Sequence, residues 1–207
     1  MIITYFGKEF FKIQQGELTV AFNPISKDSK SFNGGKFGSD IALITTNHAD
    51  YNGVAQLSHG EREPFVIKGP GDYEVKEIFI KGVMSEAKIG GEDYINSIYS
   101  LAIDNINIVF LGALVNADIS KEAREAINEP DVLFIPVGAG TLDPKSAAKL
   151  AASLEPKLII PMDYDKESLK VFLKEAGDEN KKPEDKLTLK RKDLDGKEGE
   201  VLILDAQ

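Results

Sequence analysis

The chain contains no cysteine and no tryptophan, and its histidines are limited to His48 and His59. Without cysteine the protein cannot form disulfide bonds, thiolate zinc sites or a cysteine nucleophile. The missing thiols also fit a reducing compartment. Two imidazoles are too few for any site that needs three or more histidine ligands, so a whole class of metal chemistry is excluded.

Positive charge and long apolar segments are also scarce. Lys and Arg total 25 against 34 Asp and Glu, which gives a net charge of −9. Proteins that bind duplex nucleic acid usually carry a clustered basic surface, so we do not expect a nucleic-acid partner. No apolar run reaches the roughly 20 residues of a membrane-spanning helix, and the first residues lack the features of a signal peptide. We therefore expect a soluble, cytoplasmic protein with no membrane partner.

The remaining composition is that of an ordinary globular protein. The chain has 207 residues, of which 42% are apolar and 29% are charged. This length is enough for one α/β domain, or at most for two small ones. No linker or fixed-period repeat divides the chain, so we predict a single domain over residues 1–207. Whether copies of the chain form a homo-oligomer stays open at this point.

The first half of the chain is predicted to consist mostly of strands. Residues 41–45 form the continuous apolar run that is typical of a strand buried on both faces. Asp104 and Asn105 separate two further apolar segments and predict a two-residue hairpin turn. Residues 26–39 are polar and rich in glycine, so we expect a surface loop there. The predicted strands cover residues 2–6, 9–14, 18–22, 41–45, 65–68, 78–84, 98–103 and 106–111.

The second half alternates strands and helices. Ser120 can cap a short helix over residues 120–128, and Asp143 followed by Pro144 marks the start of a longer one. Apolar residues then recur at the spacing of one helix face, in Ala147, Leu150, Ala151 and Leu154 and again in Leu169, Phe172, Leu173 and Ala176. Strands are predicted at residues 132–136 and 158–161, and a closing strand pair at 187–189 and 201–204. This order predicts two sheets whose outer faces are covered by helices.

Residues 44–54 have the most chemical content. The segment begins where the buried strand ends, and functional groups often lie at such positions because the strand fixes them while the loop exposes them. His48 and Asp50 are two residues apart and could turn toward one cation. The competing interpretation is a structural pair, in which the imidazole and the carboxylate serve only local hydrogen bonds.

The chain also resembles a known family, the metallo-β-lactamase superfamily, and within it the compact Zn-dependent hydrolases of the β-lactamase fold. The resemblance implies a four-layer αββα sandwich and a hydrolase that binds one or two zinc ions. It is carried by blocks that span nearly the whole chain, at residues 3–7, 23–24, 45–54, 65–75, 110–112, 131–138, 154–157 and 160–164.

The ligand positions of that family are mostly substituted in this chain. The family loop reads His-x-His-x-Asp-His, and the resemblance places Thr46, His48, Asp50 and Tyr51 at those four positions. Two imidazoles of the loop are therefore missing. Further departures are Ala113 for a bridging aspartate, Asp163 for a histidine, Lys8 for a histidine and Asn23 for an aspartate.

Two functions follow from this pattern. In the first, His48, Asp50 and Asp163 hold one divalent cation, with Asp50 as the catalytic residue, and the protein weakly hydrolyses an ester, lactone or phosphoester-type bond of a small-molecule substrate. One imidazole and two carboxylates suit a hard ion better than tightly bound zinc. In the second, Lys8 pairs with Asp50 or Asp163 in place of the metal charge, no metal is bound, and the protein is an inactive binding or assembly module.

Overall fold

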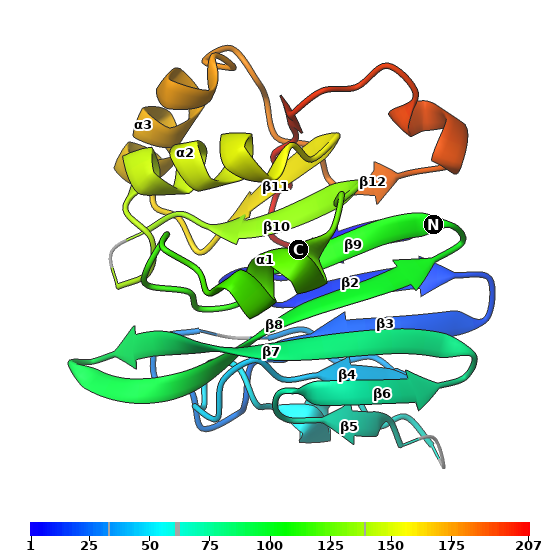
Figure 1. Ribbon diagram of the computed structural model, residues 1–207. Coiled ribbons are helices and arrows are strands. Elements are labelled where there is room, and N and C mark those ends of the chain that lie inside the picture. The colour runs from blue at the N-terminus through cyan, green and yellow to red at the C-terminus, as the bar shows by residue number, and fades with distance from the viewer. Residues whose placement is uncertain (33, 61–62, 139) are drawn as a thin grey trace.

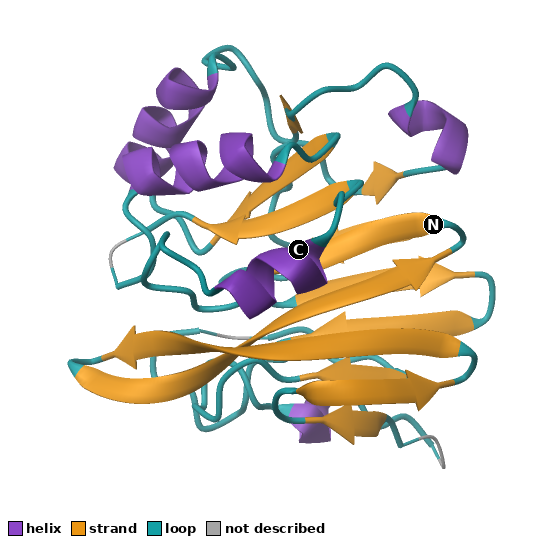
Figure 2. Ribbon diagram, in the orientation of Figure 1, coloured by secondary structure: helices purple, strands orange, loops and turns teal. Residues whose placement is uncertain are grey.

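The computed structural model describes residues 1–32, 34–60, 63–138 and 140–207. Two mixed β-sheets face each other, and α-helices lie outside one of them (Figure 1, Figure 2). The predicted sandwich of two facing sheets is therefore confirmed. Within the described residues, no helix is both long enough and apolar enough to cross a membrane.

The first sheet is built mainly from the N-terminal part of the chain. Its strands from β12 to β3 are antiparallel, whereas β3, β4 and β5 are parallel. In spatial order its six strands are β12 (Leu187–Thr188), β1 (Ile2–Tyr5), β2 (Phe11–Gln15), β3 (Leu18–Phe22), β4 (Ile41–Leu43) and β5 (Phe65–Ile67).

The second sheet joins a parallel half to an antiparallel half. The strands from β13 to β9 are parallel, and those from β9 to β6 are antiparallel. Its seven strands are, in spatial order, β13 (Glu200–Val201), β11 (Leu158–Met162), β10 (Val132–Pro136), β9 (Ile106–Phe110), β8 (Glu92–Ile103), β7 (Ile78–Ile89) and β6 (Gly71–Val75).

Aromatic side chains pack at the centre of the sandwich. Phe11 and Phe22 of the first sheet meet Phe110 and Phe134 of the second, and the rings of Phe22 and Phe110 stack with their centroids 4.5 Å apart. Aliphatic residues of both inner faces surround these rings and are almost completely buried. This layer fixes the two sheets relative to each other, so residues at the strand ends have a rigid support.

In the described part of the chain, three α-helices cover the outer face of the second sheet, namely α1 (Lys121–Ile127), α2 (Pro144–Leu154) and α3 (Lys166–Ala176). The predicted caps are confirmed. The Ser120 side chain accepts a hydrogen bond from the Ala123 backbone. Asp143, which directly precedes Pro144, accepts from the backbone amides of Lys145 and Ser146. The apolar stripes of α2 and α3 face the sheet, which explains why these helices were readable from their periodicity.

The outer face of the first sheet differs from the prediction, because within the described residues loops cover it instead of an α-helix. These loops lie within residues 25–32, 34–40 and 44–57, on either side of β4 in the chain, and include the 3₁₀-helix η1 (Val54–Gln56). Phe32 and Phe37 from the loop pack with Phe6 and Phe10 against the sheet. Polar residues and glycine make up most of residues 26–39, so aromatic contacts rather than a helical stripe bury this face.

Two further expectations are wrong. The hairpin of β7 and β8 has arms of 12 residues each and projects beyond its neighbours, whereas the sequence predicted its strands only to residue 84 and from residue 98 (Figure 1). The segment between these positions is polar and lacks a clear apolar alternation.

The predicted closing strand pair does not form, because β12 pairs with β1 and β13 pairs with β11 in the other sheet. The remaining short helix, η2 (Arg191–Leu194), lies between those two strands in the chain.

Candidate functional site

The candidate site lies at the edge of the sandwich where parallel strands of both sheets end. Asn23 follows β3, Thr45 lies just beyond β4, and Asp163 directly follows β11. Lys8 comes from the turn between β1 and β2. Open α/β sheets bind ligands outside the carboxyl ends of their strands, so this edge is where the fold favours a site.

Lys8 and Asp163 form the central contact of the site. The Lys8 ammonium donates to both oxygens of Asp163, at 2.7 and 2.8 Å, and each side chain is only 13% exposed. The two backbones are also joined, since the Asp163 amide donates to the Lys8 carbonyl at 2.8 Å. Burial raises the pKa of Asp163, the Lys8 ammonium opposes that rise, and the nearby charge of Asp50 adds to it. The ion pair therefore compensates a carboxylate that burial alone would disfavour.

Glu9 directly follows Lys8 in the chain and is completely buried. One carboxyl oxygen accepts a 2.9 Å hydrogen bond from the Asn23 amide, whereas the other has no hydrogen-bond partner within the described part of the chain. Burial raises the pKa of Glu9 well above its usual range, and the charge of Asp163 raises it further, while Lys8 and Asn23 oppose the rise. These effects favour the neutral carboxyl in the folded protein.

Asn23 ties Glu9 to the end of β4. Its side-chain amide donates to the Thr45 hydroxyl at 2.9 Å, and its carbonyl oxygen accepts from the Thr45 backbone amide at 2.8 Å. The backbone of Asn23 has a positive φ of 45°. The φ angles of Lys8 and Asp163 are also positive, at 56° and 52°. Left-handed backbone is costly for residues other than glycine, and such strain tends to gather at functional positions.

Asn96 of β8 joins two positions that the family resemblance assigns to metal ligands. Its carbonyl oxygen accepts from the Thr46 hydroxyl at 3.2 Å and from the Ala113 backbone amide at 3.0 Å. Its amide nitrogen donates to the Leu111 carbonyl at 2.8 Å. Gly112 is required between them, because it has a φ of +60° and an added Cβ would lie 2.4 Å from the Asn96 oxygen. A neutral amide thus connects the ends of β4 and β9.

His48 and Asp50 lie side by side but serve local contacts. The His48 Nδ1 atom accepts from the Asp50 backbone amide at 3.2 Å and lies 3.6 Å from an oxygen of the Asp50 carboxylate. The Ser29 hydroxyl donates to the other Asp50 oxygen at 2.6 Å. Because the serine hydrogen-bonds the aspartate and not the histidine, these three residues do not form a nucleophilic triad.

Two aromatic rings lie close to the Lys8 ammonium. The nitrogen is 5.2 Å from the centroid of Phe32 and 5.4 Å from that of Tyr51. Tyr51 is almost completely buried, and burial raises the pKa of its hydroxyl, so the ring stays neutral. The family resemblance places Tyr51 at the last histidine of the loop, so it predicts an aromatic ring at the position of an imidazole ligand.

These residues do not fit a zinc centre of the family type. A catalytic zinc needs about three firm protein ligands and an open position for water. Among residues 1–32, 34–60, 63–138 and 140–207, no group of three or more His, Asp or Glu side chains is placed to hold a metal ion. Asp163 binds Lys8, and Asp50 accepts from Ser29. The assignment of His48, Asp50 and Asp163 as ligands, and of Asp50 as catalytic, stays a prediction.

Sequence reasoning missed Glu9 and Asn96. A signal for Glu9 was present, because Lys8 and Glu9 are charged residues between aromatic ones in an otherwise apolar segment. Asn96 lies in a polar part of the long hairpin, where no pattern separated it from its neighbours. Its role depends on the approach of the β4 and β9 ends, which are distant in sequence.

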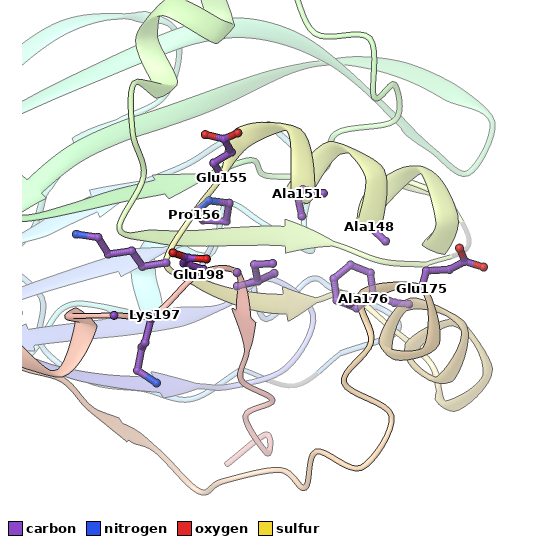
Figure 3. Close-up of a pocket in the computed structure, with 14 residues that line it drawn as sticks. Ala148, Ala151, Glu155, Pro156, Glu175, Ala176, Lys197 and Glu198 are labelled. Atoms are coloured by element: carbon purple, nitrogen blue, oxygen red, sulfur yellow. The ribbon is translucent and has the colours of Figure 1, made fainter.

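A separate groove lies between α2, α3 and the loop of residues 196–199, next to β11, and shares no residue with this site (Figure 3). Its volume is about 820 Å³. Alanines and Phe172 line it, with charged residues such as Glu155 and Glu198 among them. It contains no histidine and no cluster of nucleophilic side chains, so the chemistry of the protein is better sought at the strand ends.

Comparison with solved structures places this fold among metal-dependent hydrolases. A candidate Zn-dependent hydrolase of the metallo-beta-lactamase superfamily from Thermotoga maritima is 27% identical, with a TM-score of 0.75 over 100% of this chain and 99% of that one. A candidate metal-dependent hydrolase from Parabacteroides distasonis is 19% identical, with a TM-score of 0.66 over 99% and 93%. A metallo hydrolase from Ignicoccus hospitalis is 16% identical, with a TM-score of 0.62 over 99% and 95%. No curated protein sequence matches the chain significantly.

The family assignment rests on sequence as well as on shape. The model of the beta-lactamase superfamily domain matches residues 2–163, which include Lys8, both strand ends around Asn23 and Thr45, and Asp163. The match therefore spans every element that builds the site described above. The chain belongs to the beta-lactamase superfamily.

Proposed function

We propose that this chain is a metal-independent member of the superfamily and acts as a binding or assembly module rather than as a zinc hydrolase. The observation that carries the proposal is the bidentate contact of the Lys8 ammonium with both oxygens of Asp163. A cation at those oxygens opposes a divalent ion electrostatically and also takes up the donor atoms that the ion would need. The ammonium thus supplies in the folded chain the positive charge that a metal would supply in a relative.

The charges around the ion pair support the same proposal. Burial raises the pKa of Glu9 and so favours its neutral form, and Asp50 accepts a hydrogen bond from the Ser29 hydroxyl. Hydrolysis by this fold would need a metal-bound water whose pKa is lowered to roughly 7. With the carboxylates engaged by protein groups, nothing in the described residues lowers the pKa of a water in that way. The relatives named above are described as metal-dependent hydrolases, and we propose that this chain departs from them at this step.

The alternative is a weak mono-metal hydrolase that uses His48, Asp50 and Asp163 as ligands, with zinc or another divalent cation. Elemental analysis of the full chain, purified from metal-replete medium, separates the two functions. We expect far less than one metal ion per chain, and the same low content in His48→Ala. A stoichiometric metal that is lost in His48→Ala would overturn the proposal, as would metal-dependent cleavage of an ester or phosphoester by the wild-type protein but not by His48→Ala.

A further inference from the structure

The Lys8 ammonium lies in an enclosure that resembles a binding site for a ligand cation. The carboxylate of Asp163 holds it on one side at 2.7 and 2.8 Å. The rings of Phe32 and Tyr51 lie 5.2 and 5.4 Å away, within the distance at which an aromatic face attracts a cation. We call Asp163, Phe32 and Tyr51 the ammonium cage. These residues come from three different parts of the chain, so the folded structure assembles the cage.

The chemistry of the cage selects the kind of cation. Divalent metals take several oxygen or nitrogen ligands, and ring faces do not serve as such ligands. An alkylammonium group has three N–H donors for a carboxylate and a charge that ring faces attract. One carboxylate with two rings therefore suits an organic ammonium better than a metal ion. The carboxylate of Asp50 is a further negative charge close to Asp163.

Lys8 enters the cage from a backbone that is not relaxed. Its φ is 56°, a region in which glycine is at ease and lysine is not. Its carbonyl oxygen is held by the Asp163 amide at 2.8 Å and by the Tyr5 hydroxyl at 2.9 Å. These contacts fix the turn independently of the lysine side chain. The side chain can therefore be removed by substitution to glycine without adding backbone strain.

We propose that the ammonium cage is a binding site for a primary alkylammonium group, which the chain fills with its own Lys8. The ligand class is a straight alkyl chain that ends in a protonated primary amine. The inference rests on the proposed function in one respect, because both require that no metal ion occupies this edge of the sandwich. It goes further, because it states what the cage binds when Lys8 is absent.

The test is chemical rescue of Lys8→Gly. Removal of the side chain leaves the cage empty and Asp163 without its cation, so the variant should unfold at a lower temperature than the wild type. n-Butylammonium reproduces the missing four-carbon stem and its charge. At ten times its dissociation constant it should raise the Tm of Lys8→Gly by about 3–6 °C. The wild type, whose cage is full, should show no such rise at matched ionic strength.

Four controls define the site. n-Butanol, which lacks the charge, should not rescue Lys8→Gly. The double variant Lys8→Gly/Asp163→Asn should not respond to butylammonium, because the carboxylate is gone. Adding Phe32→Leu to Lys8→Gly should weaken butylammonium binding about 2–5-fold, which corresponds to the loss of one exposed cation–π contact. Substitution of Lys121, whose ammonium lies on the surface near Glu125, gives a matched variant that should not respond to butylammonium.

The outcomes separate this inference from the proposed function. If Lys8→Gly does not fold alone, recovery of its circular dichroism on refolding in butylammonium replaces Tm as the readout. Failure of that recovery, while Lys8→Gly/Asp163→Asn folds, overturns the cage. Stronger stabilisation of Lys8→Gly by Zn²⁺ or Mn²⁺ than by butylammonium overturns it as well. A metal-free wild type without amine rescue refutes the cage alone, whereas stoichiometric metal in the wild type refutes the proposed function.

Discussion

Two aspartates lie at opposite ends of neighbouring parallel strands, and their pKa values shift in opposite directions. Asp131 precedes β10 and is 5% exposed, whereas Asp163 follows β11 and is 13% exposed. Asp131 accepts hydrogen bonds from Lys157 at 2.8 Å and from the Asn107 backbone amide at 2.8 Å, and it pairs with Arg191. Burial alone would raise the pKa of Asp131, but these donors outweigh it and lower the pKa.

At Asp163 the balance is reversed, because burial raises its pKa despite the bidentate contact with Lys8. The cations at Asp131 are also partly hydrated, with side chains 34% and 47% exposed, while the Lys8 side chain is 13% exposed. The amino end of the strands therefore carries a structural ion cluster with shared partners. The carboxyl end carries an enclosed charge pair in which Lys8 is the cation.

The largest expected effect compares the same substitution at the two ends. Lys8→Met should lower the free energy of unfolding at pH 7 by about 3–5 kcal/mol, because it leaves a buried carboxylate without its cation. Lys157→Met should cost about 1 kcal/mol or less, since Asp131 keeps Arg191 and the Asn107 amide. Urea unfolding of both variants measures the difference. Equal losses would show that the two aspartates are not energetically distinct.

A double variant checks the cause of the Lys8→Met effect. In Lys8→Met/Asp163→Asn the buried charge is absent, so most of the lost stability should return. If the double variant is as unstable as the single one, the loss comes from packing of the lysine stem and not from an unpaired carboxylate.

Removal of the Asp131 charge should have a smaller effect that depends on pH. Asp131→Asn should cost about 2 kcal/mol at pH 7 through weakened charge-assisted hydrogen bonds. Because the pKa of Asp131 is lower in the folded protein, its stabilisation is complete above the unfolded pKa of about 3.9 and is lost as the pH falls through the folded value. Thermal unfolding of both proteins from pH 7 to pH 2.5 should show the difference shrinking below about pH 4. A constant difference would contradict this account.

The contribution of Glu9 to stability should depend on pH in the opposite direction. Its pKa is raised in the folded protein, so the folded state is favoured below the unfolded pKa of about 4.3 and loses this advantage as the pH rises. Glu9→Gln should differ from the wild type by less than about 1 kcal/mol at pH 5. The variant should become relatively more stable toward pH 8, as measured by urea unfolding. Parallel profiles would mean that Glu9 does not resist ionisation.

The smallest expected effect is a difference in salt dependence. Raising NaCl to about 1 M shortens the screening length to about 3 Å and should weaken the partly hydrated cluster at Asp131 more than the enclosed pair at Asp163. The stability difference between wild type and Lys157→Met should therefore shrink by less than about 1 kcal/mol. The difference between wild type and Lys8→Met should stay nearly constant in the same titration. A salt-sensitive Lys8 difference would show that solvent reaches the pair.

Local patterns were enough to predict much of the fold. The apolar run of residues 41–45 predicted a buried strand, which the structure has as β4, and Asp143 with Pro144 fixed the start of α2. Asp104 and Asn105 both have positive φ values, as the predicted hairpin turn requires. The extent of the β7–β8 hairpin and the separate sheets of β12 and β13 were not predictable, because long-range pairing determines them and leaves no local periodicity.

The candidate site was also predictable only in part from the sequence. Residue types alone established that the histidines and aspartates of the family pattern are largely replaced, since Thr46, Tyr51 and Ala113 carry neither an imidazole nor a carboxylate. The sequence also named Lys8 as a cation that could pair with Asp50 or Asp163. It could not choose between them, because the choice depends on which strand end comes within hydrogen-bond distance of the β1–β2 turn.

The amino-acid sequence by itself determined the family, the two-sheet architecture and the lack of imidazoles for a family-type zinc centre, because these properties depend on local patterns and on which side chains exist. Only the tertiary structure decided that Lys8 binds Asp163, that Phe32 and Tyr51 lie near its ammonium, and that Glu9 is buried without a full set of partners. Distances between residues 8, 51 and 163 follow from how the sheets pack. Burial, which changes the charge state of a carboxyl, exists only in the folded protein.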